Sequence, residues 1–220
     1  MSENTTPRRK FIGALLSGAA ALGLTTLSTP LKASEELMSA VETEPAEALF
    51  KNLKGKHKIV FDTPAYRSGA ALAWTNAFLK TNNETGTADK DLNVVIVLRS
   101  MAIGMSMPDA IWEKYKLGEL YKVDDPETKA PAIRNIFTIA DPDEKDMSIA
   151  ELQKRGVLFT VCRLAIKGNS EHIAEKMNLK GEDVHKVLLA NVLPGIQTVP
   201  SGVWALGRAQ EKGCAYCMAG

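Results

Sequence analysis

The sequence has little of several features that mark specialised protein classes. Cysteines number 3 and aromatic residues make up 6% of the 220 residues, so a disulfide-dense mini-scaffold is excluded. Hydrophobic residues at 45% and charged residues at 24% exclude a disordered or collagen-like chain and leave enough apolar side chains for a sizeable core. The sequence also has no G-x-S-x-G elbow, no Walker phosphate loop and no G-x-G-x-x-G fingerprint.

Most of the chain also lacks an excess of positive charge. The formal net charge is +1, but residues 1–33 hold four bases and one acid, so the remainder carries a net charge of −2. A domain near neutrality lacks the basic face that nucleic-acid binding normally requires. We therefore expect no nucleic-acid partner.

Residues 1–33 are typical of an export signal. Arg8 and Arg9 precede the uncharged segment FIGALLSGAAALGLTTLS, and a twin arginine in this position resembles a twin-arginine (Tat) signal. The segment is also long enough to span a membrane, but its many Gly, Ala and Thr residues favour export. The expected location is therefore periplasmic or extracellular. Because Leu31-Lys32-Ala33 is an imperfect small-x-small cleavage site, an uncleaved membrane tether remains an open alternative.

The rest of the chain predicts one α/β domain. Residues 34–56, rich in Glu and Lys, predict a spacer or surface helix, and the domain is expected over residues 57–220. Short β-branched runs that predict strands alternate with segments of helical spacing. The expected strands are 58–62, 92–98, 157–162, 196–199 and 214–218. Strands separated by helices indicate right-handed crossovers and a mostly parallel sheet covered on both faces.

The carboxyl ends of the strands are the expected ligand-binding edge of such a sheet. Cys162 ends the third strand, next to Arg163, and Arg99 follows the second. Backbone amides and basic neighbours favour a nucleophilic thiolate there, although a cysteine in a buried strand is equally often inert. Arg67, in the Arg67-Ser68-Gly69 segment ahead of a helix, is a further candidate contact for an anion such as sulfite or thiosulfate; the alternative is an ordinary turn.

Two more cysteines near the chain end, Cys214 and Cys217, form a Cys-x-x-Cys pair. An odd number of cysteines in an exported chain cannot all pair within one molecule. Residues three apart on a strand point to opposite faces, so a disulfide between these two needs a turn. Thiolates and thioethers also suit copper(I), and a single Cys-x-x-Cys is half of a zinc site. The residues of this alternative metal site are Cys214, Cys217, Met218, Met101 and Met105; the competing interpretation of the methionines is core packing around Trp112.

Three segments resemble the DsrE/DsrF-like family. They are GVLFTVC at 156–162, LPGIQTVPSG at 193–202 and QEKGCAY at 210–216. The resemblance implies a flavodoxin-like doubly wound α/β fold with a five-stranded sheet, assembly into trimers or hexamers, and sulfur relay through a cysteine persulfide. It places Cys162 at the position of the family's sulfur-carrying cysteine. The chain departs from the family at Cys214, where an aromatic residue is usual, and after the second strand, where relatives often have a histidine.

Residues and resemblance together predict an exported DsrE-like protein that handles sulfane sulfur. Cys162 would take sulfur as a persulfide from a small-molecule or protein donor and pass it to an acceptor, without a cofactor. The supporting residues expected are Arg67, Arg99 and Arg163 for the anionic donor, and Cys214 and Cys217 for resolving the persulfide. The alternative hypothesis is a non-catalytic soft-metal or assembly module, in which the tail thiols bind copper or zinc and Cys162 is inert.

Overall fold

The computed structural model describes residues 43–138 and 147–220. The expected Tat signal, with its cleavage site, lies outside these residues, as does the first part of the expected spacer. Within the described part of the chain, no helix has the length and apolar character needed to cross a membrane.

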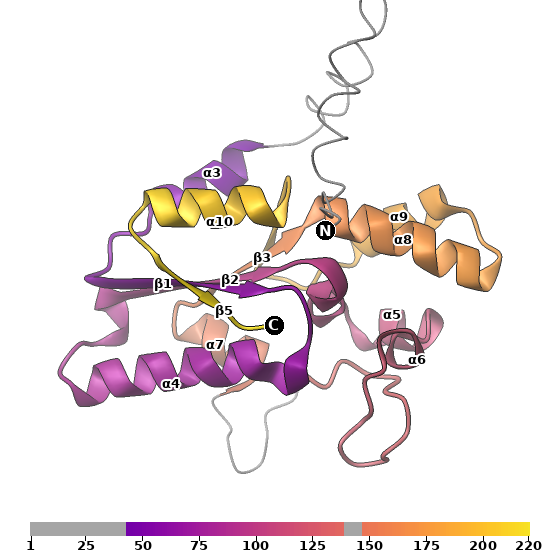
Figure 1. Cartoon of the computed structure of the whole chain (residues 1–220), viewed down its shortest axis with the longest axis horizontal. Helices are drawn as coiled ribbons and strands as arrows, with labels where there is room; N and C mark the ends of the chain where they lie inside the picture. Colours follow the sequence, from indigo (N-terminus) through magenta and orange to yellow (C-terminus); the bar gives the residue numbers. More distant parts are fainter. Residues whose placement is uncertain (1–42, 139–146) are drawn as a thin grey trace, which may run out of the picture. The chain divides into compact units, whose positions relative to one another are not determined.

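Five parallel strands form one sheet in the order β4-β3-β2-β1-β5 (Figure 1). The strands are β1 (His57–Thr63), β2 (Leu92–Leu98), β3 (Leu158–Cys162), β4 (Ile196–Val199) and β5 (Ala215–Met218). Every hydrogen-bonded pair of strands is parallel. The central strands are continuous apolar runs, such as LNVVIVL in β2, because a parallel sheet is buried on both faces. The predicted doubly wound, flavodoxin-like α/β fold is confirmed.

The order in which the strands are laid down decides which face each helix covers. From β1 to β4 the chain moves steadily across the sheet, so right-handed crossovers place the connecting helices on one face. The return to β5, beside β1, places its helix on the opposite face. The first face carries α4 (Ala70–Glu84), α7 (Ile149–Lys154), α8 (Arg163–Met177) and α9 (Gly181–Ala190), whose buried side chains share one core. The second carries α3 (Thr43–Lys51) and α10 (Gly202–Glu211), and Figure 1 shows α10 and α4 on opposite sides of the sheet.

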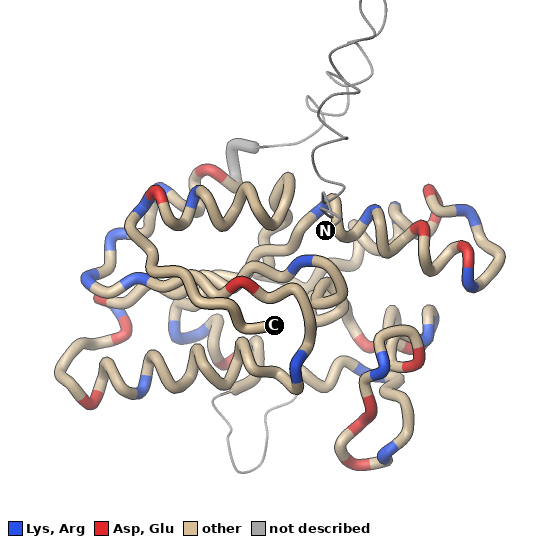
Figure 2. The backbone as a smooth tube through the Cα atoms, viewed as in Figure 1, with Lys and Arg blue, Asp and Glu red and all other residues tan. Residues whose placement is uncertain are grey.

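The connections that leave β1 and β2 contain the short helices. They are η1 (Arg67–Gly69), η2 (Asp89–Asp91), η3 (Ser100–Ser106), α5 (Asp109–Lys114) and α6 (Leu117–Tyr121). Lys, Arg, Asp and Glu are interspersed along the helices and loops, whereas the strands are almost free of them (Figure 2). Charge of both signs therefore surrounds a sheet whose strands carry few charged residues, Asp62 of β1 among them.

The folded unit begins with helix α3, ahead of the boundary expected at residue 57. Ala46 and Phe50 are fully buried and Leu53 nearly so, in the same core as Val60 and Val95. Their spacing of four and three residues places them on one helical face. The charged residues between them resemble a solvated segment in the sequence, which is why residues 34–56 predict a spacer or surface helix.

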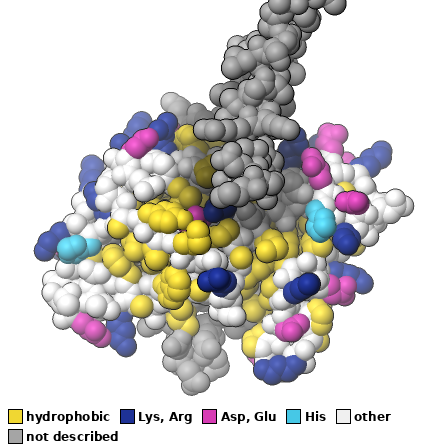
Figure 3. Space-filling view, viewed as in Figure 1, with side chains coloured by type: hydrophobic (Ala, Val, Ile, Leu, Met, Phe, Trp, Pro, Cys, Tyr) yellow, Lys and Arg dark blue, Asp and Glu magenta, His cyan; other side chains and the backbone are white. Residues whose placement is uncertain are grey.

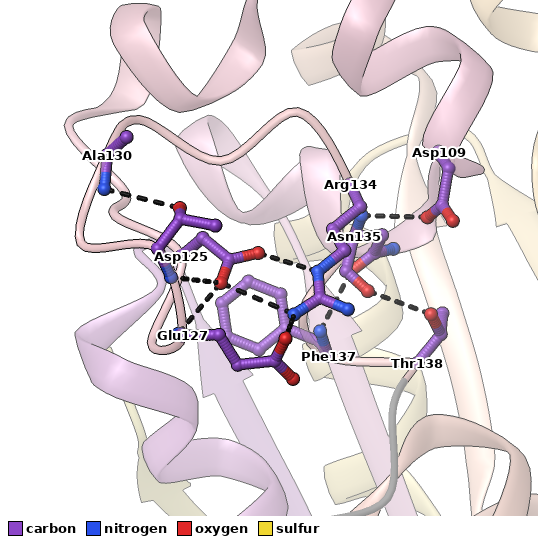
Figure 4. Close-up of polar contacts among 9 residues, drawn as sticks. Asp109, Asp125, Glu127, Ala130, Arg134, Asn135, Phe137 and Thr138 are labelled. Carbon is purple, nitrogen blue, oxygen red and sulfur yellow. Dashed lines mark hydrogen bonds and ion pairs between the residues drawn. The ribbon is translucent and has the colours of Figure 1, made fainter.

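Residues 122–138, between α6 and the end of the first described range, are fixed by polar contacts (Figure 4). The Asp125 carboxylate accepts hydrogen bonds from Arg134 Nε at 2.6 Å and from the Glu127 amide at 2.8 Å. The Asn135 side-chain amide donates to two carbonyl groups, those of Met105 at 2.9 Å and Met107 at 2.7 Å. These bonds hold the loop against η3.

Two glycines offer a matched test of this packing. A Cβ on Gly118 in α6 would meet the backbone N and O of Ala132, whereas a Cβ on Gly168 in α8 would meet nothing within 4 Å. We expect Gly118→Ala to lower the free energy of unfolding by about 1–3 kcal/mol because the loop backbone must move. We expect Gly168→Ala to raise it by about 0.5–1 kcal/mol, the helix-propensity gain. Urea unfolding of both variants checks this, and equal stabilities would contradict the packing of the loop on α6.

The ionisation of Asp125 makes the free energy of unfolding depend on pH in the acid range. The Arg134 guanidinium, followed by the Glu127 amide, lowers the pKa of Asp125 to about 2. A carboxylate with a lowered pKa contributes stability that is complete above its unfolded pKa of about 4 and is lost as the pH falls through its folded pKa. Asp125→Asn should therefore flatten the fall in unfolding free energy between about pH 4 and pH 2. Urea titrations at several pH values measure the slope, with Asp124→Asn as the control that should keep it.

Candidate functional site

The strand register places Arg99 and Cys162 side by side at the carboxyl edge of the sheet. Leu98 of β2 pairs with Val161 of β3, so the residues that follow them stand at one level, about 5 Å apart. Alternation along the strands directs both to the α10 face, because Val97, two residues before Arg99, packs in the α10-side core. The same alternation places Asp62, which pairs with Val97, on this face.

This edge contains the topological switch point of the sheet. After β3 the chain enters α8 on one face, and after β4 it enters α10 on the other. Doubly wound proteins usually bind their ligands at the switch point, where neighbouring connections diverge. Cys162 pairs with Val199, so it lies at this switch point, where β3 leads into α8 and β4 leads toward α10.

A buried carboxylate fixes Arg99. Arg99 donates from Nε and Nη2 to the two carboxylate oxygens of Asp62, at 2.6 and 2.9 Å, and Tyr216 donates its hydroxyl to Oδ2 at 2.8 Å. The Asp62 side chain is almost fully buried, while that of Arg99 is 27% exposed. The bond to Asp62 raises the pKa of Arg99; burial opposes the rise, and the charges of Asp62, Tyr216 and Cys162 add to it. Bonding to Asp62 likewise raises the pKa of Tyr216.

Cys162 is a free thiol at the start of a helix. Its Sγ accepts a hydrogen bond from the Ala165 amide at 3.2 Å and thereby caps α8. The residue is 6% exposed, so the sulfur lies just beneath the surface. The Cys162 sulfur thus lies at the amino-terminal end of a helix, on the strand next to the one that Arg99 follows.

Helix α10 begins against the Arg99 side chain. Ser201 caps the helix by accepting from the Trp204 amide at 3.1 Å. A Cβ on Gly202 would lie 2.9 Å from both Cβ and Cδ of Arg99, so glycine allows the arginine stem to pass at this point. Cys162, Arg99, Asp62, Tyr216 and the start of α10 together define what we call the thiol site.

The other two expected arginines lie elsewhere. Arg163 begins α8, and together with Lys167 it contributes to the lowered pKa of His185 on α9, which burial lowers most. Arg67 is exposed in η1, where it lines a cavity that does not include Cys162. Of the three arginines, the structure brings Arg99 to Cys162.

The expectation that Cys214 or Cys217 resolves a persulfide on Cys162 is wrong for thiols of the same chain. Cys217 on β5 pairs with Phe61, which lies level with Phe159 through β2. It is thus three strands from β3, about 14 Å, and about 10 Å farther back along the strand direction. A disulfide requires Cα atoms within about 7 Å. Cys214 lies still farther back.

The residues of the alternative metal site do not come together either. Cys214 is buried in the α10-side core, where burial raises its pKa, whereas Cys217 packs against the core on the opposite face. Met105 is fully buried near Trp112, in line with core packing, and Met101 and Met218 are exposed. Among residues 43–138 and 147–220, no three His, Cys, Asp or Glu side chains are grouped so as to hold a metal ion.

The sequence interpretation missed two residues of the thiol site, Asp62 and Tyr216. Asp62 can be recognised from the sequence, because a lone carboxylate at the end of an apolar, buried strand must find a partner. Tyr216 cannot be recognised from the sequence in this way, because its contact with Asp62 depends on β5 lying beside β1.

Comparison with known proteins finds no matching family model and no matching curated protein. A solved structure, described as the protein of unknown function MTH1491 from Methanobacterium thermoautotrophicum, aligns over 74% of this chain and 99% of its own, at 15% identity and a TM-score of 0.41.

Asp62 provides the test of the thiol-site geometry. Asp62→Asn keeps the shape of the side chain but leaves the Arg99 guanidinium without its counter-charge. We expect the free energy of unfolding to fall by about 2 kcal/mol, as for hydrogen bonds to charged groups. Tyr216→Phe removes one hydroxyl at a half-exposed position and should cost less than about 1 kcal/mol. Urea unfolding of both variants measures the difference, and an Asp62→Asn protein as stable as the parent would contradict the buried ion pair.

Proposed function

We propose that this protein carries sulfane sulfur as a persulfide on Cys162. The observation that supports this most is the Cys162 thiol at the amino-terminal end of α8, next to an Arg99 guanidinium fixed by a buried carboxylate. The resemblance of three segments to the DsrE/DsrF-like family supports the same role. The twin arginine at Arg8 and Arg9 supports a site of action outside the cytoplasm, and the resemblance supports assembly as a homo-oligomer.

The sulfur step needs no oxidant or cofactor. The Cys162 thiol first loses its proton to solvent, and the thiolate attacks the outer sulfur of a thiosulfate or polysulfide anion. A bond forms between Sγ and that sulfur, the sulfur–sulfur bond of the donor breaks, and its electron pair leaves with sulfite or the shortened polysulfide. The total charge is unchanged. Attack by an acceptor thiolate on the outer sulfur of the persulfide then releases Cys162 again.

Arg99 holds the anion in this scheme. A guanidinium has five N–H donors, and two of those of Arg99 are bonded to Asp62. The remaining donors have no partner among the described residues and can bind an oxyanion or a polysulfide end. The pair with Asp62 is close to neutral, so the additional attraction for an anion comes from the amide dipoles at the starts of α8 and α10.

The surroundings of the thiol site favour exchange with a protein. Apolar side chains gather on the face that carries β5 and the chain end (Figure 3). Val203 at the start of α10 is 69% exposed, Leu164 at the start of α8 is 65% exposed and Met218 on β5 is 53% exposed. Exposed apolar patches of this kind mark protein-binding surfaces. We therefore include a protein thiol among the donors or acceptors.

Mass analysis tests the carrier role. The full chain with Cys214→Ser and Cys217→Ser is treated with polysulfide and freed of excess reagent. We expect a gain of about 32 Da, one sulfur atom, on the peptide that contains Cys162. The gain should disappear in Cys162→Ser. An unmodified Cys162 in protein whose thiol is labelled readily by iodoacetamide would refute the proposal.

Arg99→Gln separates anion binding from thiol reactivity. With thiosulfate as donor, loading of Cys162 should slow by about tenfold, the loss of one charge-assisted contact. Reaction with the neutral reagent iodoacetamide should change less than about twofold. Arg67→Gln is the matched control and should load at the parent rate. Equal loading by the Arg99→Gln and parent proteins would remove Arg99 from the mechanism.

A further inference from the structure

The structure assigns a second ligand site, separate from the thiol site and independent of the proposed function. It is a cavity of about 720 Å³ on the α4 face, between the start of α4 and the end of α6, which we call the aromatic cavity. Its volume lies in the range of small-molecule sites, about 300–1,000 Å³. We propose that it binds a flat aromatic or polycyclic molecule that carries an anionic group.

Three aromatic rings form its wall. Tyr66 and Phe137 are stacked with centroids 5.5 Å apart and planes 8° from parallel, and Tyr121 lies 5.3 Å from Tyr66. Trp112 supports the wall from behind, edge-on to Tyr66 at 6.0 Å. Apolar residues, among them Leu72, line the rest. Flat faces of this kind bind other flat rings by stacking.

The wall is rigid before any ligand binds. Tyr66 is 6% exposed, and burial raises its pKa well above the ordinary value, so the ring stays neutral. The Tyr121 hydroxyl donates to Asn169 Oδ1 at 2.6 Å, and Asn169 donates to the Ser100 carbonyl at 2.9 Å. A wall that is already ordered does not have to lose conformational freedom when a ligand binds, which favours affinity.

Two basic side chains lie at the cavity, Arg67 from η1 and Lys122 just after α6. Both are exposed, and neither forms an ion pair with another described residue. Asp124 is the acidic residue of the described lining, so cationic groups outnumber it. An apolar wall with a basic rim suits an aromatic anion better than a neutral or cationic ring.

Backbone conformation fixes the points at which the two bases leave their elements. Arg67 and Lys122 have φ values of 32° and 57°, and Ser68 has 51°. Lys122 is the left-handed cap that ends α6, and Arg67 and Ser68 lie in the turn of η1. These conformations hold two basic residues from distant parts of the chain at one cavity.

Binding of 1-anilinonaphthalene-8-sulfonate to the full chain tests the proposal. This aromatic sulfonate should bind with one-to-one stoichiometry by titration calorimetry and gain fluorescence in the apolar site. N-phenyl-1-naphthylamine, the same ring system without the sulfonate, is the neutral partner probe. We expect Arg67→Gln with Lys122→Gln to weaken sulfonate binding by about fivefold to tenfold, two charge contacts, and to change binding of the neutral probe less than about twofold.

A substitution that fills the aromatic cavity provides the second part of the experiment. Ala73 lines the cavity from α4 at a half-buried position, so Ala73→Trp should abolish binding of both probes at an unchanged melting temperature. Lys80→Gln removes a base of α4 outside the described lining and should bind like the parent. Cys162→Ser should also bind like the parent, which separates this site from the sulfur proposal. Undiminished binding to Ala73→Trp, or equal loss of both probes in the Arg67/Lys122 variant, would overturn the assignment.

Discussion

The thiol site depends on one constraint, the burial of the Asp62 carboxylate at the end of β1. A buried charge is costly unless it is paired and hydrogen-bonded, and here Arg99 from β2 and Tyr216 from β5 satisfy it. The contacts that satisfy the buried carboxylate also hold Arg99 beside Cys162. The side chain that neutralises the buried carboxylate is therefore the one that carries positive charge to Cys162, and neither contact can be changed without the other.

The strand order decides where helices α8 and α10 begin. With β5 beside β1, only the connection after β4 crosses to the opposite face, so α8 and α10 both begin at the switch point between β3 and β4. Both helix starts are capped by side chains, α8 by Cys162 and α10 by Ser201. The alternation of β3 directs the Cys162 side chain to the face that carries α10.

The sequence predicts those features that depend on short segments. The five strands, the α/β class and the positions of Cys162 and Arg99 at strand ends follow from local apolar runs. The sequence does not predict which arginine lies beside the Cys162 thiol, because Arg67, Arg99 and Arg163 all follow strands. Only the register and the turn conformations separate them. The distance from Cys217 to Cys162 likewise depends on the position of β5. A surface helix was among the expectations for residues 34–56, but the burial of α3 in the core was not, because charged residues interrupt its buried stripe.

Both sites depend on η3, which begins immediately after Arg99. Ser100 bonds to Asn169 of α8, Met101 lines the aromatic cavity, and residues 102–107 are buried. Trp112 donates to the Gly104 carbonyl at 2.9 Å, and Asn135 bonds to the carbonyls of Met105 and Met107. A 3-10 helix leaves many of its backbone groups without a helical partner, and here buried side chains donate to its carbonyls and hold it in place. Of the methionines that resemble metal ligands in the sequence, Met105 is thus part of this anchor, whereas Met101 and Met218 are exposed.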